Sequence, residues 1–327
     1  MIEVKHLTKY YSETAAVCDL SFTVNDGRIY GFLGPNGAGK TTTMNMITGS
    51  LAPTSGEVLI DGLDIFKEPK AAKKSIGYLP EIPPLYPDLT VGEYLRFAAE
   101  LKKTDRRSRS REISDVLNEL GLLEVENRLI RNLSKGFRQR TGIAQALIGN
   151  PGTLILDEPT AGLDPKQITE IRALIRELGK KHTVLLSSHI LSEVNEICDE
   201  ILIISRGKLV ASGTPESLRA PGYSGDEIIV TVEGEEEIVR RAIAEEYPSG
   251  AGSCRILPGG DGTCTIHLRT ENAADAKRSL GRALVAQGLV IIEMKTETES
   301  LEDVFLRLTS EDERAAFVSG RPNGSDL

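Results

Sequence analysis

The residues best suited to chemistry near the N-terminus form a glycine-rich loop. The stretch from Gly34 to Thr41 reads Gly-Pro-Asn-Gly-Ala-Gly-Lys-Thr, which matches the phosphate-binding pattern G-x-x-x-x-G-K-[ST]. Glycines let backbone N–H groups curl around a phosphate with no Cβ in the way, although a plain glycine turn is the alternative. Lys40 would reach the terminal phosphates, and Thr41 would offer its hydroxyl to Mg²⁺. The residues predicted to make these contacts are Gly34, Pro35, Asn36, Gly37, Ala38, Gly39, Lys40, Thr41 and Thr42.

Two carboxylates at the end of an apolar run form a second candidate site. Residues 154–156 are typical of a buried strand, and Asp157 and Glu158 follow them. Ligands of parallel sheets bind at this carboxyl edge, so the pair is expected beside the glycine-rich loop. Asp157 would orient Mg²⁺, directly or through water, and Glu158 would act as general base on the attacking water. Alone, two acids after a strand could also be a solvated helix cap.

A third pattern lies between these two and precedes a predicted helix. It runs from Leu133 to Arg140 and reads Leu-Ser-Lys-Gly-Phe-Arg-Gln-Arg. Ser134 and Gly136 stand where a hydroxyl and backbone amides at a helix N-terminus can contact a γ-phosphate. By itself the stretch also fits an ordinary capped helix. In its place between the loop and the acidic strand, it resembles the LSGGQ signature of ATP-binding cassette (ABC) proteins.

The resemblance to ABC proteins implies further site residues. Tyr11 is similar to the aromatic residue that stacks on adenine, with Tyr10 as the neighbouring candidate and a core tyrosine as the alternative for either. The segment from Ala161 to Asp164 resembles the D-loop, and His189 resembles the switch histidine that touches the γ-phosphate. Glu81 stands where the Q-loop glutamine is expected. The implied ligands are ATP and Mg²⁺. The implied catalytic residues are Glu158, His189 and Lys40, the Mg²⁺ ligands are Thr41, Glu81 and Asp157, and the other nucleotide contacts are Tyr11, Ser134, Gly136 and Asp164.

Three positions depart from the common ABC pattern. Glu81 replaces the Q-loop glutamine, which bears on how Mg²⁺ and the permease are sensed. Lys135 and Phe137 replace a glycine and a glutamine of the signature, but its serine and second glycine remain, so catalysis is expected to survive. These variants and the ending Ser-Leu-Glu-Asp-Val-Phe-Leu at 300–306 resemble the branch of ATPases that serve ABC-2-type exporters. That branch includes drug-export subunits and ATPases associated with gliding motility.

The elements that must position these residues follow an α/β pattern. Residues 1–65 read as short strands and tight turns, which predicts N-terminal antiparallel strands. Residues 86–150 show helical spacing and predict a helical subdomain. From 153 to 210 strands and helices alternate, which predicts a parallel sheet with helices on both faces. With the resemblance, the expected fold class is an α/β P-loop NTPase cassette.

The last third of the chain reads as a separate module. A stretch rich in proline, glycine and serine at 220–225 marks a boundary, so the cassette is expected to span residues 1–220. Residues 221–310 show the βαββαβ order of a small ferredoxin-like α+β module, followed by a last short helix. Such a module suits ligand sensing, dimerisation or simply bracing two cassettes. Residues 311–327 are polar and are predicted to form a disordered tail.

Composition and charge restrict the class of protein. The chain has 327 residues, of which 40% are hydrophobic and 27% charged, as in soluble globular proteins. Its net charge is −9, and the acidic excess lies beyond residue 220, so no part has the basic excess that nucleic-acid binding requires. No apolar stretch approaches the roughly 20 residues of a membrane span, and the first residues lack a signal-peptide core. The four cysteines form no CxxC pair and are expected to be reduced.

The function implied by the resemblance is ATP binding and hydrolysis that powers a separate permease, in an ABC-2-type exporter. The chain carries one glycine-rich loop and one signature, so a second ATP-binding subunit, a copy or a paralogue, is expected to complete an ATP-sandwich dimer. The permease would dock beside Glu81 and residues 82–95, where Leu85, Tyr86 and Tyr94 could either form a groove or pack the subdomain. The protein is expected in the cytoplasm, held at the inner face of the membrane by the permease.

Two other functions fit the same motifs. A soluble ABC ATPase acting on the ribosome or DNA would need no permease, but the two cassettes of ribosomal members and the long coiled coil of DNA-repair members are not seen in this sequence. A nonhydrolysing ATP sensor would not need Glu158 and His189.

The basic run at 102–111 predicts a solvated loop, with a patch for anionic lipid as the alternative.

Overall fold

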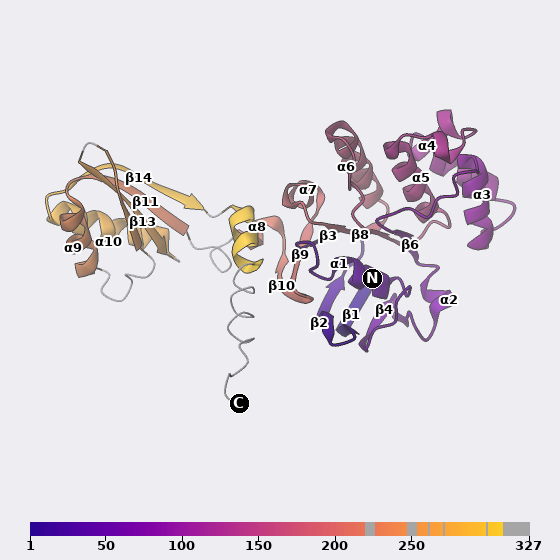
Figure 1. Ribbon diagram of the computed structural model, residues 1–327, viewed down its shortest axis with the longest axis horizontal. Coiled ribbons are helices and arrows are strands. Elements are labelled where there is room, and N and C mark those ends of the chain that lie inside the picture. The colour runs from indigo at the N-terminus through magenta and orange to yellow at the C-terminus, as the bar shows by residue number, and fades with distance from the viewer. Residues whose placement is uncertain (220–225, 247–253, 261, 271, 299, 310–327) are drawn as a thin grey trace, which may run out of the picture. The chain divides into compact units, whose positions relative to one another are not determined.

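The structure is a computed structural model that describes residues 1–219, 226–246, 254–260, 262–270, 272–298 and 300–309 (Figure 1). The chain divides into two compact units, Met1–Thr214, with which Leu308 and Thr309 are grouped, and Pro215–Arg307. The predicted boundary at 220–225 and the predicted tail at 311–327 lie outside the described residues. The division comes earlier in the chain, ahead of the short helix α8 (Pro215–Leu218).

A small antiparallel sheet opens the first unit. Its strand β1 pairs with β2 on one side and β4 on the other, so that Ile2 faces both Val24 and Ile60. All three side chains are fully buried, because paired residues of neighbouring strands lie on the same face of the sheet and this face belongs to the core. The predicted N-terminal antiparallel strands are thereby confirmed. In sheet order the strands are β2 (Thr14–Val24), β1 (Ile2–Tyr11), β4 (Ser55–Ile60) and β5 (Leu63–Asp64).

The second sheet is the predicted parallel sheet. Five of its six strands are parallel, and β10 pairs antiparallel with β9 at one edge. The strands β3, β7 and β8 are buried along their whole length, which explains why their sequences do not alternate between apolar and exposed polar residues. The sequence patterns single out neither β6 nor β10. In sheet order the strands are β10 (Lys208–Gly213), β9 (Glu200–Ser205), β3 (Ile29–Leu33), β8 (Thr183–Ser188), β7 (Thr153–Leu156) and β6 (Ile76–Leu79).

Helices cover both faces of this second sheet. In Figure 1, α6 (Pro165–Gly179) and α7 (Leu191–Ile197) lie on one side of it. On the other side, α1 (Lys40–Ile47) lies between it and the antiparallel sheet. The short helix α2 (Pro69–Ala72) leads into β6. The layered α/β cassette expected from the sequence is therefore present.

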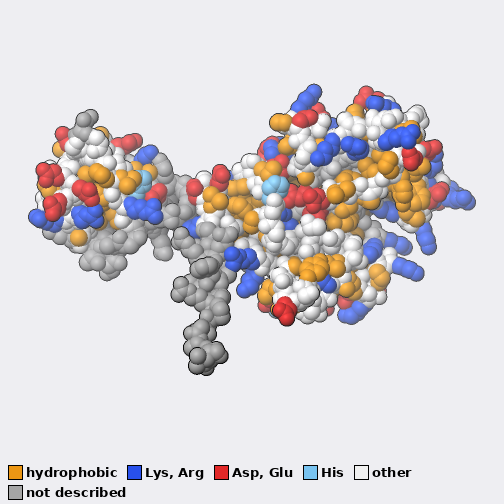
Figure 2. All heavy atoms as spheres, in the orientation of Figure 1, with side chains coloured by type: hydrophobic (Ala, Val, Ile, Leu, Met, Phe, Trp, Pro, Cys, Tyr) orange, Lys and Arg blue, Asp and Glu red, His pale blue; other side chains and the backbone are white. Residues whose placement is uncertain are grey.

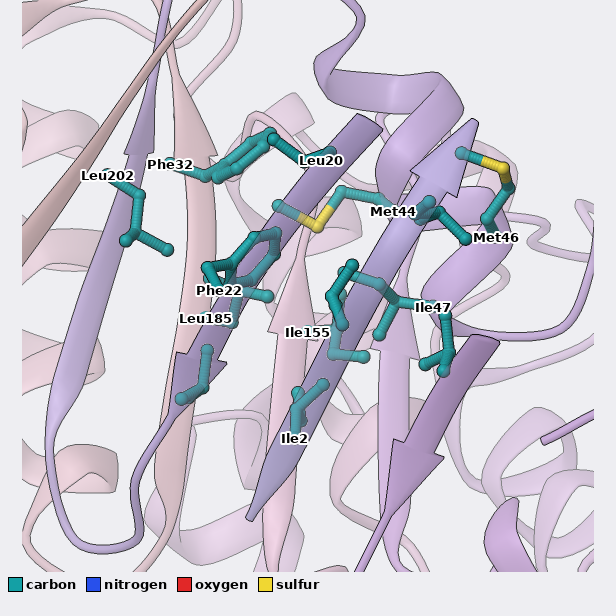
Figure 3. Close-up of a cluster of buried hydrophobic side chains, with 14 of the residues drawn as sticks. Ile2, Leu20, Phe22, Phe32, Met44, Met46, Ile47, Ile155, Leu185 and Leu202 are labelled. Atoms are coloured by element: carbon teal, nitrogen blue, oxygen red, sulfur yellow. The ribbon is translucent and has the colours of Figure 1, made fainter. Parts of the chain in front are cut away.

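The main core of the first unit fills the space between its two sheets (Figure 3). Phe22 of β2 and Phe32 of β3 meet there, with ring centroids 5.6 Å apart. Met44 and Ile47 reach the same cluster from α1 and are fully buried. This packing fixes α1 from both sides, and with it the glycine-rich loop at the start of the helix.

Between β6 and β7 the chain forms the predicted helical subdomain. Thr90 and Glu93 make a capping box at the start of α3, in which each side chain bonds the other residue's backbone N–H. The subdomain contains α3 (Val91–Leu101), α4 (Arg109–Glu119) and α5 (Lys135–Leu147), with short 3₁₀ turns at Leu123–Val125 and Ile130–Asn132.

The basic run at 102–111 is not simply a solvated loop. Its first residue, Lys102, is half-buried, and its Nζ donates to the carbonyls of Ala146 (2.9 Å) and Ile148 (2.6 Å) at the end of α5. Burial lowers the pKa of Lys102 to about 8. The Lys102 ammonium therefore caps the C-terminal end of α5. Its carbonyl partners lie 44 and 46 residues away in the chain, so the basic run alone could not predict this contact.

The second unit has the predicted βαββαβ order. Its strands form one antiparallel sheet, and α9 and α10 cover one face, where Val230 and Val232 pack with Leu280 and Leu284. A helical segment at 301–309 follows. In sheet order the strands are β12 (Cys254–Pro258), β13 (Thr263–Thr270), β11 (Asp226–Glu233) and β14 (Val290–Thr298), and the helices are α9 (Glu236–Glu246) and α10 (Ala273–Ala286).

Two further features bear on the class of protein. Within the described ranges, no helix combines the length and the apolar character that crossing a membrane requires. The four cysteines are free thiols, and burial raises the pKa of the Cys198 thiol, which makes that side chain a packing residue rather than a nucleophile.

Candidate active site

The glycine-rich loop joins β3 to α1, and its glycines are required by the surrounding chain. Gly39 has a φ of 101°, and a Cβ there would lie 2.5 Å from the Ala16 carbonyl oxygen. A Cβ at Gly34 would lie 2.5 Å from the Ile204 carbonyl oxygen. The loop therefore rests directly on neighbouring backbone. Gly39 is required by both its positive φ and the lack of space, and Gly34 by the lack of space alone.

Lys40, the first residue of α1, is buried beneath this loop. Only 6% of it is exposed, and its Nζ donates to the carbonyls of Gly34 (2.9 Å) and Pro35 (3.2 Å). The same Nζ lies 3.4 Å from Oε1 of Glu158. A buried ammonium needs such partners, and phosphate oxygens could take their place.

Glu158 joins the other two residues predicted to be catalytic. Its Oε1 faces Lys40, and its Oε2 lies 2.9 Å from Nδ1 of His189. Its backbone has a φ of 46°, which is unusual for a residue with a side chain, and its N–H donates to the Ser187 hydroxyl (2.8 Å). Strand ends from β7 and β8 thus bring together residues that are far apart in the sequence.

Asp157 is fully buried at the same edge of the sheet. Its Oδ1 accepts a hydrogen bond from Ser187 (2.5 Å), whereas its Oδ2 has no hydrogen-bond partner among the described residues. Burial raises the pKa of this carboxyl, the nearby hydroxyls of Ser187 and Thr41 lower it, and the charges of Glu158 and Glu81 raise it again. A buried carboxylate oxygen of this kind suits a cation, because a positive charge would offset its desolvation.

Lys40, Glu158 and His189 line a cavity of about 380 Å³, whereas the predicted site residues Gly34, Pro35, Ala38 and Asp157 are not part of its lining. Nine predicted site residues line it, together with Ala161 from the segment that resembles the D-loop and Ala16 of β2, which no sequence motif includes. Ala16 enters because β2 packs against the loop, a long-range contact with no local sequence signal. The predicted lining residues are Asn36, Gly37, Gly39, Lys40, Thr41, Thr42, Glu81, Glu158 and His189.

Tyr11 lies outside the cavity lining. It is 50% exposed, and Nζ of Lys9 lies 5.5 Å from its ring centroid. Tyr10 is 46% exposed, so neither tyrosine is a core residue. Because both side chains are exposed, either ring is accessible to a ligand. The stacking of Tyr11 on adenine stays a prediction.

The signature residues lie in a different hollow, of about 350 Å³. Ser134 caps α5, where its hydroxyl accepts from the Phe137 N–H (3.3 Å), and Gly136 follows in the first turn. Asp164 caps α6 in the same hollow, with Oδ1 accepting from the Gln167 N–H (2.9 Å). This hollow shares no lining residue with the cavity at Lys40. The chain's own signature therefore does not complete its own phosphate site.

Comparison with known sequences decides the family. The family described as ABC transporter matches residues 17–161, from β2 to the residue after Thr160. Over 94% of its length, the chain is 36% identical to 99% of an uncharacterised ABC transporter ATP-binding protein of Bacillus subtilis, YxlF. The chain belongs to the ABC transporter family.

Other relatives of this ABC protein agree. It is 34% identical, over 94% of its length and 97% of the relative, to the bacitracin transport ATP-binding protein BcrA of Bacillus licheniformis. A dimeric structure of a post-hydrolysis state of an ATP-binding cassette, bound to ADP and Pi, is 26% identical over 65% of this chain and 98% of that one, with a TM-score of 0.59. This ABC protein is therefore an ATP-binding subunit of a transporter and an ATPase. Subunits of this kind dimerise and work with membrane permeases.

Two of the departures from the common ABC pattern meet in a third hollow, of about 630 Å³, beside the cavity. Glu81 and Lys135 both line it, and the Lys135 side chain lies over Gly162.

The remaining histidines lie elsewhere: His182, for example, is buried with Nδ1 2.8 Å from the Pro151 carbonyl.

Proposed function

We propose that this ABC protein hydrolyses ATP within a head-to-tail dimer of cassettes and thereby powers a separate permease of the ABC-2 exporter type. The observation that carries the proposal is the position of Glu158, whose two carboxylate oxygens face Lys40 and His189 at one cavity. The separate signature hollow supports the dimer, because the signature of a second subunit would supply the contacts that this cavity lacks.

Each residue of the cavity has one task in this proposal. Lys40 exchanges its loop carbonyl partners for phosphate oxygens and neutralises their charge. Glu158 takes the proton of the attacking water, a general-base contribution worth about 10²–10⁴-fold in rate. His189 holds the Glu158 carboxylate in place through Nδ1 and lies at the cavity wall, where the γ-phosphate would bind.

Mg²⁺ fits the residues at the edge of the cavity. The unpartnered Oδ2 of buried Asp157 and the hydroxyl of Thr41 are oxygen ligands of the kind that Mg²⁺ prefers, and Glu81 offers a third. When bound, Mg²⁺ would neutralise phosphate charge. The resident carboxylates orient the ion and would otherwise repel the phosphates.

The hollow that contains Glu81 is the proposed docking site of the permease. Ile82 is 83% exposed at its wall, and Leu85 also lines it. Tyr86 is exposed and packs edge-to-face on Phe97, with ring centroids 5.4 Å apart. Hydrophobic side chains are exposed on the face shown in Figure 2, over the region where α3 and α5 lie in Figure 1.

Tyr94 serves the other alternative, packing of the helical subdomain. It is 3% exposed, and its hydroxyl donates to the Pro84 carbonyl (3.2 Å). Desolvation by burial raises the pKa of Tyr94 to about 12. Tyr94 therefore packs inside the helical subdomain, while Ile82 and Tyr86 leave apolar surface exposed for a partner.

The exporter assignment rests on a relative and on the sequence ending at 300–306. BcrA is named for bacitracin transport, and this chain matches nearly its whole length. The ending falls in the helical segment at 301–309. Docking on the permease would hold the protein at the inner face of the membrane.

Glu158→Gln is the experiment that tests the proposal. The amide keeps the size of the side chain but cannot take up a proton, so phosphate release should fall by about 10²–10⁴-fold. ATP binding should survive, since the loop is unchanged, and the variant should accumulate as an ATP-bound dimer in size-exclusion chromatography. Glu177→Gln, at an exposed position on α6, is the matched control and should behave as wild type.

Two outcomes would contradict the proposal in different ways. Hydrolysis by Glu158→Gln at the wild-type rate would remove Glu158 as the base. A variant that is inactive, binds ATP and stays monomeric with its permease present would contradict the dimer mechanism.

A further inference from the structure

Beside the candidate active site lies a buried acidic side chain that none of the motifs includes. Glu193 is in the first turn of α7 and is 3% exposed. Its Oε2 accepts hydrogen bonds from the Thr160 hydroxyl (2.7 Å) and the Ser188 hydroxyl (3.1 Å). Both donors are themselves buried. Burying a carboxylate is costly unless it is paired and hydrogen-bonded, so these contacts define its place in the fold.

The two hydroxyls belong to the two segments that carry proposed catalytic residues. Thr160 is two residues after Glu158, and Ser188 directly precedes His189. A single carboxylate oxygen therefore fixes the position of one segment relative to the other. The contact that these segments support is the 2.9 Å approach of Glu158 Oε2 to His189 Nδ1.

The backbone alone does not hold the segments together at this point. The parallel pairing of β7 with β8 ends at Leu156 and Leu186. Beyond this point, the Ser187 hydroxyl donates a hydrogen bond to Asp157 and accepts one from the N–H of Glu158. Glu193 then connects Thr160 to Ser188. Side-chain hydrogen bonds therefore link the two segments where the backbone pairing of β7 and β8 has ended.

The charge of Glu193 is compensated from α6. Its Oε1 lies 3.4 Å from NH2 of Arg172, whose NH1 bonds Glu196 (2.6 Å). In the described part of the chain, Glu193 Oε1 and Arg172 Nε have no hydrogen-bond partner. The arginine therefore offsets the charge, while the hydrogen bonds of Glu193 go to Thr160 and Ser188.

We infer that Glu193 is a positioning residue for ATP hydrolysis, which sets the contact between Glu158 and His189 through the hydroxyls of Thr160 and Ser188. The inference rests on the roles proposed above for Glu158 and His189. A misplacement of about 1 Å can lower an enzyme's rate by about 10²-fold, so its loss should act on kcat. The KM for ATP should change little, because the glycine-rich loop is not touched.

The test compares steady-state ATP hydrolysis by full-length variants. Glu193→Ala should lower kcat by about 10- to 100-fold with KM within about threefold of wild type. Glu193→Gln keeps an oxygen acceptor for both hydroxyls and should restore most of the rate. Glu196→Ala is the matched control, since it removes an exposed partner of Arg172 from the same helix without touching the two hydroxyls. Thr160→Val removes one donor at nearly constant volume and should give an intermediate kcat even if Glu193→Ala folds poorly.

A double-mutant cycle separates positioning from general support of the fold. In a His189→Ala background the contact is already lost, so Glu193→Ala should lower kcat further by less than about twofold. An equal loss in both backgrounds, or a wild-type kcat in Glu193→Ala, would overturn the inference. If Glu158→Gln and His189→Ala themselves keep the wild-type rate, the proposed roles fail and the inference fails with them. If those two are inactive and Glu193→Ala is not impaired, the inference alone fails.

Discussion

Asp157→Asn should stabilise the protein without nucleotide and metal, while it abolishes ATP hydrolysis. The Asp157 carboxylate is fully buried, and its Oδ2 has no hydrogen-bond partner in the described structure. Burial raises its pKa, and the charges of Glu158 and Glu81 contribute in the same direction. The ionised side chain is therefore unfavourable in the folded state until a cation is bound.

The size of the effect follows from the contacts of this carboxylate. A buried polar group without a partner costs about 1–3 kcal/mol, and more when it is charged. Asparagine removes the charge and keeps an oxygen acceptor for Ser187, but its amide N–H groups then need a partner, so a net gain of about 1 kcal/mol is expected. In a unit of this size that gain raises Tm by about 2–4 °C.

The pH dependence gives the effect a sign that can be checked. The pKa of Asp157 in the folded protein lies above its ordinary value of 3.8, so the folded state binds the proton more tightly than the unfolded state. Protonation of Asp157 therefore stabilises the folded state at low pH, and this stabilisation is lost as the pH rises through the pKa of the folded protein. Asparagine does not titrate. The difference in Tm should therefore be present at pH 7 and should shrink as the pH falls towards about 4.

The assay is thermal unfolding followed by fluorescence, in EDTA and without nucleotide, at several pH values. Asp88→Asn is the matched control, because Asp88 is exposed and pairs only at the surface with Arg131, and its Tm should stay within about 1 °C of wild type. An Asp157→Asn variant that melts below wild type at pH 7 would refute the reasoning. So would a difference that grows as the pH falls, since the folded state would then favour the ionised form.

Two further substitutions test neighbouring residues. Lys40→Ala removes the buried ammonium and should weaken ATP binding by about 10- to 100-fold, measured by calorimetric titration, and near-native affinity would mean that the loop does not bind phosphate in this way. Glu81→Gln should keep at least about a tenth of the ATPase rate in a phosphate-release assay, because an amide oxygen can still ligate Mg²⁺. A fall of about 10²-fold or more would instead make Glu81 an essential base.

The parts of the site that could be predicted from the sequence are those that depend on neighbouring residues. The loop from Gly34 to Lys40 is specified locally, since its glycines, its lysine and the following helix are consecutive. The strand ending in Asp157 and Glu158 is also local, because an unbroken apolar run marks a strand buried on both faces.

The parts that could not be predicted depend on contacts between distant segments. Ala16 lines the cavity only because β2 packs on the loop, and an alanine in a strand has no distinctive pattern. Glu193 reads as one more polar residue of a short helix until the fold places Thr160 and Ser188 against it. The strand β6 is as short as β7, but Gly77 and the half-buried Tyr78 interrupt it, so it lacks the unbroken apolar run that marks a buried strand.

The separation of the signature hollow from the phosphate cavity has a consequence for genetics. Because the two hollows share no lining residue, an allele altered at Lys40 and an allele altered at Ser134 damage different halves of the composite site. In a mixed dimer of the proposed kind, one interface would combine both defects, and the other would combine an intact loop with an intact signature. Two inactive alleles expressed together would then complement each other in part, whereas two alleles altered in the same hollow would not.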